Sequence, residues 1–288
     1  MPQQVSAAEQ VTIVTVSYNS LTVLPQMLAS VPEEAKVVVV DNASDDRVAL
    51  QALCDQHGAA CQLNDCNMGF GTACNQGAAV ATTPFVLFLN PDATLMPDTL
   101  DQLVAAAARY PKASAMNPRI AAPNGSAFFH RATRLLPREE HMPRGWPEKD
   151  REVTLLSGAA LFVRRSDFEA VGGFDPKIFL YHEDDDLSIR LRKERGPILF
   201  IRDALVQHQA GSSTPRRPQV AALKAYHRAR SAVYATRKHG RSAPFVHALL
   251  MAIAGLIAPD MLWSSRRRAK NWAFLKGVLS TLRDGGAA

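Results

Sequence analysis

The sequence has few cysteines, and none of them is spaced as a metal ligand. The four cysteines stand at positions 54, 61, 66 and 74, so the chain contains no Cys-x-x-Cys pair. The common zinc frameworks use such pairs, often together with histidines at short spacings. The pattern therefore excludes a zinc framework of that kind and predicts reduced thiols.

The sequence also lacks the features of a secretory leader and of a membrane-spanning helix. Residues 1–10 are polar and rich in alanine, without the basic and apolar regions that a leader needs. The apolar stretch 245–257 has 13 residues, whereas a helix that crosses a bilayer needs about 20. We therefore expect a cytoplasmic protein.

Acidic residues are scarce at the C-terminal end. Residues 215–288 contain 14 of the 33 lysines and arginines but only 2 of the 27 aspartates and glutamates, which leaves the remaining chain net acidic. A basic segment on an acidic body predicts contact with an anionic surface such as acidic lipid headgroups. A solvated basic helix face is the alternative. Because aromatics are not interleaved with the basic residues, we expect no nucleic-acid partner.

Apolar strands alternate with helical stretches in the first 110 residues. This alternation predicts an α/β fold with a mostly parallel central sheet flanked by helices. Ligands of such sheets bind beyond the carboxyl ends of the strands. Asp41, Asn67 and Asp92 stand at or just after such ends. The predicted strands are 11–16, 36–40, 61–63 and 84–89, and the predicted helices are 21–31, 47–57, a segment ending near 80, and 98–110.

The rest of the chain is less regular. Residues 124–151 are predicted to form a long loop that could act as a lid. A strand interrupted by Ser157 and Gly158 is expected within 155–163, and short strands are expected at 198–201 and 204–206, with His208 in the polar loop that follows. A C-terminal helical extension begins near residue 218. Its apolar stretch 245–257, followed by a tryptophan and three arginines, fits an interfacial membrane anchor, a buried hairpin or a dimer contact.

Four consecutive acidic residues, Glu183 to Asp186, follow an aromatic residue and an apolar stretch. Neighbouring carboxylates repel one another, so their closeness costs free energy unless their charge is used. Leu187, Leu191 and Arg190 predict that the run forms the first turn of a helix, where carboxylates suit the helix dipole. A purely structural acidic turn is therefore one interpretation. The second acidic site, at Asp92, favours a functional one.

Two acidic sites permit transfer of an activated sugar to a hydroxyl group. A sugar on a nucleoside diphosphate leaves that diphosphate behind, and a divalent cation held by hard oxygen ligands would neutralise its charge. A carboxylate base would take the proton of the attacking hydroxyl. Asp92 fits the first role and an acid of the 183–186 run fits the second. His208 could add a metal or phosphate contact.

Eight short segments, in order along residues 11–214, resemble the motifs of a family 2 inverting glycosyltransferase with the GT-A fold. The Asn-Pro-Asp and Asn-x-Gly-Phe-Gly forms are most similar to the rhamnosyltransferase-like branch. The segments are Val14-Thr-Val-Ser-Tyr-Asn19, Val39-Val-Asp-Asn-Ala-Ser44, Asn67-x-Gly-Phe-Gly-x-Ala-x-Asn75, Leu89-Asn-Pro-Asp92, Gly158-Ala-Ala-Leu-Phe162, Gly172-Gly-Phe-Asp175, Glu183-Asp-x-Asp-Leu187 with Arg190, and Val206-x-His208.

The resemblance implies a role for each matching position. Asp184 would be the catalytic base, supported by Glu183, Asp186 and Arg190. Asp92 and His208 would hold Mg²⁺ or Mn²⁺. Asp185 stands where neutral residues are common in the family, and its charge could raise the pKa of Asp184. The implied donor-binding residues are Ser17, Asn19, Asp41, Asn67, Gly69, Gly71, Asn75, Asn90 and Asp92.

The resemblance also implies a function and a domain organisation. Residues 1–214 would form the GT-A glycosyltransferase domain, and residues 215–288 a basic helical extension that contacts the inner membrane face or a second copy of the chain. The enzyme would transfer L-rhamnose from dTDP-rhamnose, with inversion, to a glycan or lipid-linked glycan in cell-surface polysaccharide biosynthesis.

Three other functions remain open at this point. The donor could be a UDP- or GDP-sugar, or the chain could be a degenerate, non-catalytic scaffold. The third alternative is a nucleotidyltransferase, which shares the strand-and-helix pattern. Such an enzyme binds a triphosphate with a glycine-rich, basic loop after its first strand. Here that loop is Ser17-Tyr18-Asn19-Ser20, which has neither glycine nor a basic residue.

Overall fold

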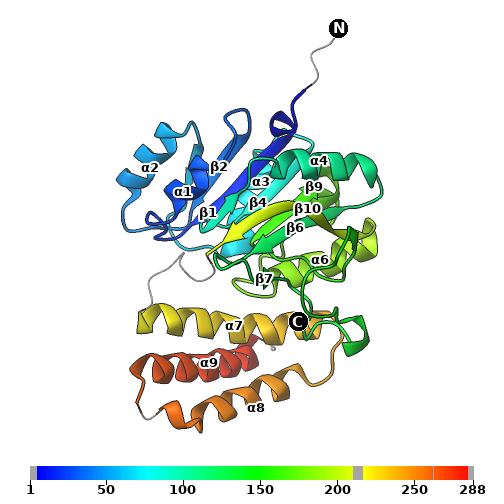
Figure 1. Cartoon of the computed structure of the whole chain (residues 1–288). Coiled ribbons are helices and arrows are strands. Elements are labelled where there is room, and N and C mark those ends of the chain that lie inside the picture. The colour runs from blue at the N-terminus through cyan, green and yellow to red at the C-terminus, as the bar shows by residue number, and fades with distance from the viewer. Residues whose placement is uncertain (1–4, 210–216, 262, 285–288) are drawn as a thin grey trace.

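The computed structural model describes residues 5–209, 217–261 and 263–284. Within these residues, one ten-stranded sheet forms the centre of the molecule, and its main path runs β3-β2-β1-β4-β9-β6-β10-β5. Helices cover both faces of the sheet, and three C-terminal helices lie together beside this α/β body (Figure 1).

The N-terminal half of the sheet is parallel, as the alternating pattern predicts. Strand β1 (Val11–Ser17) pairs with β2 (Lys36–Asp41) and β4 (Phe85–Leu89), and β2 pairs with β3 (Ala60–Leu63). The connections contain α1 (Leu24–Ala29), α2 (Arg47–Gln56) and α3 (Phe70–Ala79). A 3₁₀ turn, η1 (Ala8–Gln10), precedes β1.

The other half of the sheet is mixed. Strand β9 (Ala160–Arg164) runs antiparallel to both β4 and β6 (Ala115–Ala121), whereas β10 (Ile198–His208) runs parallel to β6. Parallel pairing is therefore characteristic of the N-terminal half and not of the whole sheet. Short antiparallel strands complete it: β5 (Ala93–Leu95) and β8 (Arg151–Glu152) on β10, and β7 (Ala127–Phe128) on β6.

Strands buried on both faces separate two apolar layers. Odd-numbered residues of β1, such as Ile13, pack against α1, α2 and α4 (Thr99–Arg109). Even-numbered residues, such as Val14, pack against α3, α5 (Arg165–Ala170) and α6 (Glu183–Glu194). Because successive side chains of a strand point to opposite faces, a continuous β-branched run supplies both layers.

Two predicted strand boundaries differ in detail from the structure, whereas the predicted long loop agrees with it. The strands expected at 198–201 and 204–206 form one strand, β10, with a register shift between Ile201 and Leu205, so His208 ends a strand and does not lie in a loop. The strand expected within 155–163 begins at Ala160, after the predicted interruption, because Ser157 and Gly158 turn toward α6. The long segment 124–151 is irregular apart from β7 and a 3₁₀ turn, η2 (Arg138–Glu140).

The C-terminal extension consists of α7 (Pro218–Lys238), α8 (Pro244–Leu256), the 3₁₀ turn η3 (Pro259–Met261) and α9 (Ser265–Asp284). A Cβ atom on Gly277 would lie 2.3 Å from the carbonyl oxygen of Tyr226, so this glycine allows α9 to approach α7 closely. No helix among the described residues is long and apolar enough to cross a membrane. The predicted domain boundary after residue 214 lies in segment 210–216, outside the described residues.

Candidate active site

A cavity of about 350 Å³ opens beyond the carboxyl ends of the parallel strands. Six of the predicted site residues line it: Asn67, Gly69, Asn90, Glu183, Asp184 and His208. These residues come from distant parts of the sequence, and the sheet topology brings them together because β1 and β4 are central neighbours. The cavity is closed on one side by Lys224 and Leu223 of α7.

The residues at the ends of the first two strands that were predicted to bind the sugar donor lie behind this cavity. Asp41 is fully buried and accepts hydrogen bonds from the backbone N–H and the hydroxyl of Ser44. Asn19, which has a left-handed backbone with φ of 56°, accepts a hydrogen bond from the N–H of Asp45 and donates its own N–H to Ser44. Ser17 ends β1 and is buried. These residues fix the loop that follows β2 and do not line the cavity.

The glycine-rich segment after β3 holds the chain that leads into the acidic helix. Gly69 has φ of +87°, and a Cβ atom there would lie 2.5 Å from the carbonyl oxygen of Phe179. A Cβ atom on Gly71 would lie 2.8 Å from the side chain of Phe174, and Asn75 exchanges two hydrogen bonds of 2.8 Å with the backbone of Phe174. Gly71 and Asn75 therefore position segment 174–179 and lie outside the cavity.

Asp92 and His208 face each other across an antiparallel strand pair. The residue after Asp92, Ala93, starts β5 and pairs directly with His208 at the end of β10. The Oδ1 atom of Asp92 lies 3.2 Å from Nε2 of His208, and Nδ2 of Asn90 lies 3.4 Å from the same nitrogen. Both Asp92 and His208 are buried. The register of β5 on β10 therefore brings His208 to Asn90 and Asp92, which precede it by 118 and 116 positions in sequence.

This donor set suits a divalent cation. Neighbouring ligands of an octahedral ion with bonds of about 2.1 Å lie roughly 3 Å apart, which matches the spacing of the Asp92 and His208 atoms. Carboxylate oxygens suit Mg²⁺ and Mn²⁺, and imidazole nitrogen is a common ligand of the later transition metals. Asp92 also acts electrostatically on Lys224. Burial lowers the pKa of Lys224 below its usual value, and the negative charge of Asp92 offsets part of that shift.

The acidic run forms the first turn of α6, as predicted. Two left-handed residues, Tyr181 with φ of 67° and His182 with φ of 71°, turn the chain sharply into the helix. Side chains that follow one another in a helix point about 100° apart. The four carboxylates therefore point in different directions, and each has its own surroundings.

Asp184 points into the cavity and is held by backbone groups. Its Oδ2 atom accepts a hydrogen bond of 3.0 Å from the N–H of Gly158, and its Oδ1 atom accepts one of 3.0 Å from the N–H of Asp185. Burial raises the pKa of the Asp184 carboxyl, and the positive charge of His130 lowers it in part. The interruption of the strand pattern at Ser157 and Gly158 thus leaves the N–H of Gly158 free to donate a hydrogen bond to the predicted base.

Glu183 lines the same cavity and is also buried. Among the described residues, its Oε2 atom has no hydrogen-bond partner. Burial and the neighbouring carboxylate of Asp184 raise the pKa of Glu183 well above its usual value. This shift favours the protonated form of Glu183, which can donate as well as accept a hydrogen bond.

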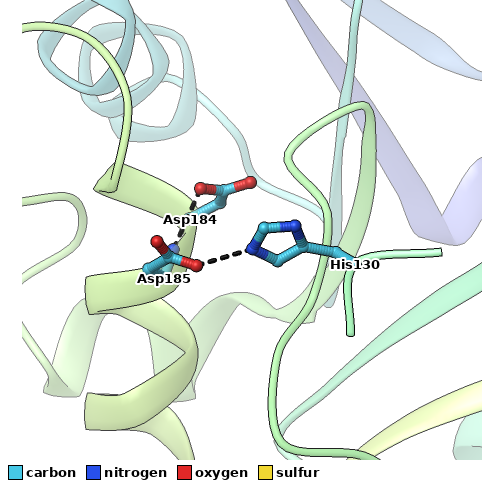
Figure 2. A group of neighbouring side chains, drawn as sticks. All are labelled: His130, Asp184 and Asp185. Atoms are coloured by element: carbon cyan, nitrogen blue, oxygen red, sulfur yellow. Dashed lines mark hydrogen bonds and ion pairs between the residues drawn. The ribbon is translucent and has the colours of Figure 1, made fainter. Parts of the chain in front are cut away.

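Asp185 points away from the cavity and binds the long loop 124–151. It accepts hydrogen bonds from Nε2 of His130 at 2.6 Å, from the hydroxyl of Thr133 at 2.7 Å and from Nδ1 of His182 at 2.8 Å. Burial raises the pKa of Asp185, but the hydrogen bonds from His130 and His182 lower it by a larger amount. The pKa of Asp185 therefore lies below its usual value. Figure 2 shows the His130 ring facing Asp185, with Asp184 beside it.

His130, Asp184 and Asp185 form a second group with potential metal-ligating atoms, which lie within 4.8 Å of one another. Burial lowers the pKa of His130, but the carboxylates of Asp185 and Asp184 raise it to about 9 overall. His130 is therefore positively charged at neutral pH, and both oxygens of Asp185 already accept hydrogen bonds. This group fits an ion-pair network better than a metal site.

Asp186 points toward the C-terminal extension. It contacts Arg190 at 2.8 Å, Lys238 at 2.8 Å and Nε2 of His239 at 2.8 Å. Burial raises its pKa, but the hydrogen bonds from His239 and Lys238 lower it to about 2. Arg190 also donates hydrogen bonds to the backbone oxygens of Val171 and Gly173. Asp186 and Arg190 therefore join α7 to the Gly172–Gly173 turn and do not line the cavity.

Three residues of this site were missed by sequence reasoning. Asn42 lines the cavity and donates a hydrogen bond of 3.0 Å to the oxygen of Gly69. Its place directly after Asp41, at a strand end, was the available signal. His130 and Lys224 lie in the long loop and in the basic extension, and their sequence surroundings gave no signal because only the tertiary structure brings them to α6 and Asp92.

The chain is similar to proteins of a known family. Residues 12–172 match the family model described as glycosyl transferase family 2. The chain is 31% identical, over 90% of its length and 94% of the relative, to the N-acetylglucosaminyl-diphospho-decaprenol L-rhamnosyltransferase of Mycobacterium tuberculosis. It is 27% identical, over 62% of its length and 75% of the relative, to the rhamnosyltransferase WbbL of Escherichia coli.

A solved structure shares the fold. The crystal structure of GalNAc-T7 with UDP, GalNAc and Mn²⁺ superposes with a TM-score of 0.61 at 16% identity, covering 95% of this chain and 56% of that one. At this identity the likeness concerns the fold alone. The family match spans more than half of the chain, and the mycobacterial relative spans nearly all of it. This protein therefore belongs to glycosyl transferase family 2.

Proposed function

We propose that this protein transfers L-rhamnose from dTDP-rhamnose, with inversion, to a hydroxyl group of a lipid-linked glycan during cell-wall polysaccharide biosynthesis. The similarity to the mycobacterial rhamnosyltransferase, which extends over 90% of the chain, carries this proposal. The cavity supports it, because Asp184 and His208 line its walls and the Asp92 carboxylate lies 3.2 Å from His208. We further propose that residues 1–214 form the transferase domain and residues 215–288 an extension that contacts the acceptor side.

Asp184 is the proposed base. Its carboxylate takes the proton of the acceptor hydroxyl while the hydroxyl oxygen bonds to the anomeric carbon and the bond to the diphosphate breaks. Attack from the face opposite the diphosphate inverts the anomeric centre. The two backbone N–H groups hold the carboxylate in one orientation, and its raised pKa makes it a stronger base than an exposed aspartate.

Asp92 and His208 would hold Mg²⁺ or Mn²⁺, with Asn90 at the edge of the set. Such an ion stabilises the negative charge that develops on the leaving diphosphate. Lys224 lines the same cavity and supplies a further positive charge from α7. Asn42, Asn67 and Gly69 form the opposite wall and present polar backbone and side-chain groups to the nucleotide and the sugar.

We expect transfer to dominate with dTDP-L-rhamnose when it is compared with UDP-N-acetylglucosamine and GDP-mannose, using N-acetylglucosaminyl-diphospho-prenol as acceptor. The product's anomeric configuration, measured by NMR, should be opposite to that of the donor. Preference for another donor would contradict the rhamnose assignment. Absence of transfer from all three donors would favour a non-catalytic scaffold.

Replacement of the proposed base should stop chemistry without preventing donor binding. We expect Asp184→Asn to lower kcat by about 10²–10⁴-fold, because general-base catalysis contributes that much. The asparagine can still accept the N–H of Gly158, so the affinity for dTDP, measured by calorimetry, should change less than about twofold. Asp101→Asn, in α4 on the other face of the sheet, is the matched control. A nearly unchanged kcat for Asp184→Asn would exclude this residue as the base.

The two candidate groups of metal ligands, Asp92 with His208 and His130 with Asp184 and Asp185, predict different effects on metal binding. Asp92→Asn should weaken Mn²⁺ affinity by about tenfold or more, since a ligating carboxylate is lost and its replacement carries no charge. His130→Gln should leave Mn²⁺ affinity almost unchanged. Calorimetric titration of Mn²⁺ in the presence of dTDP checks both variants. The reverse order of effects would move the metal to the His130 group.

The charge on His130 should set the acidic limb of the pH–rate profile. Protonated His130 favours the ionised form of Asp184, so its removal raises the pKa of Asp184. We therefore expect His130→Gln to shift the acidic limb of kcat to higher pH. His141→Gln, which changes a histidine in the same loop that bonds to the backbone of Thr133, should leave the limb in place. An unshifted or downward-shifted limb in His130→Gln would contradict this coupling.

A further inference from the structure

A second cavity, of about 870 Å³, lies on the other side of the acidic turn. Its walls come from the long loop 124–151, from α7 and from the start of α8. Tyr181, Glu183 and Asp184 line both cavities, so the two meet at the proposed base. A molecule bound in the second cavity can therefore present a group to a sugar bound in the first.

The second cavity is strongly basic. Arg134 and Arg138 come from the long loop, Arg228 from α7, and Arg241 from the turn before α8. All four are exposed, and among the described residues none of them forms an ion pair with a carboxylate. The guanidinium of Arg228 lies 5.6 Å from the ring centre of Tyr181, at the boundary with the first cavity.

Gathering like charges from three separate segments costs free energy unless an anion binds between them. Guanidinium groups suit phosphate in particular, because their planar forks donate two hydrogen bonds to its oxygens. The carboxylates of this cavity lie at its inner end, on α6, and Asp185 there accepts hydrogen bonds from His130 and His182. The arginines thus surround the outer part of the cavity, where an anionic group would enter.

The same cavity has an apolar side. Leu136, Ala248, Met251 and Phe274 line it. Next to Met251, the solvent-facing side of α8 exposes Val246, Leu250, Ile253 and Ile257, which follow one another at steps of four, three and four residues and so lie on one helix face. A contiguous exposed apolar face beside a basic cavity fits an amphiphilic ligand with an anionic group and a hydrocarbon chain.

We propose that this second cavity is the acceptor site and that its arginines bind the diphosphate of a prenyl-diphosphate-linked glycan. The diphosphate lies among Arg134, Arg138, Arg228 and Arg241, the sugar extends inward to Asp184, and the hydrocarbon chain leaves along the apolar face of α8. This assignment rests on the proposed function for the identity of the reaction. The cavity, its charge and its shared wall with the first cavity carry the choice of ligand.

Binding of farnesyl diphosphate, a short water-soluble prenyl diphosphate, tests the site. Calorimetry is carried out on the full chain in EDTA, so that no metal-held diphosphate in the first cavity contributes. We expect the double variant Arg134→Gln/Arg241→Gln to bind farnesyl diphosphate at least tenfold more weakly than the wild type. Neither arginine side chain has a partner among the described residues, so the fold should persist, and dTDP binding in the presence of Mn²⁺ checks it.

The control removes the same charge elsewhere. Lys112→Gln/Arg151→Gln replaces two exposed basic residues outside both cavities and should change the affinity less than twofold. Equal weakening by both double variants would show a general charge effect and overturn the proposal, as would an unchanged affinity in the arginine variant. Farnesyl diphosphate should also bind more tightly than inorganic pyrophosphate. Equal affinities would exclude a lipid-linked ligand.

This test is independent of catalysis, so the two proposals can fail separately. A chain that binds farnesyl diphosphate through these arginines but transfers no sugar would contradict the proposed function and keep the site. A chain that transfers rhamnose while its acceptor KM is the same in the wild type and in Arg134→Gln/Arg241→Gln would keep the function and overturn the site.

Discussion

Four adjacent carboxylates at the start of α6 are the constraint on which the rest of this structure depends. Held within one helical turn they repel one another, and the helix dipole offsets only part of that cost. Helical geometry points the four side chains in different directions, so each carboxylate meets different surroundings. Asp186 binds the C-terminal extension, Asp185 binds the long loop, and Asp184 and Glu183 face the cavities.

The different contacts of these carboxylates explain why the C-terminal extension contributes to the active site. Lys238 and His239 at the end of α7 meet Asp186, while Lys224, about four turns earlier in the same helix, lines the first cavity. The helix is thus anchored at one end by the acidic turn and closes the cavity near the other. The first turn of α8 then completes the second cavity. A change at Asp186 would therefore disturb both cavities without touching either ligand.

The buried polar network also sets the protonation states that the proposed chemistry needs. His130 and His182 donate hydrogen bonds to Asp185, so Asp184 lies beside a paired carboxylate instead of a bare one. Burial still raises the pKa of Asp184 and raises that of Glu183 further. Asp185, which departs from the residue implied by the family resemblance, is therefore accommodated by His130 of the loop and His182 of the helix entry.

The α/β fold, most strand and helix positions, and the acidic turn follow from the sequence, because β-branched runs, strand-end polar residues and helical spacing are local signals. The order of the motifs also predicts that Asp184, Asn90 and His208 belong to one site. Three features could not be predicted without the three-dimensional contacts: Asn75, Gly71, Asp186 and Arg190 hold neighbouring segments, His208 ends a strand, and the loop and the extension meet at α6. Those outcomes depend on antiparallel pairing and on ion pairs between residues 50 or more positions apart, which no local pattern encodes.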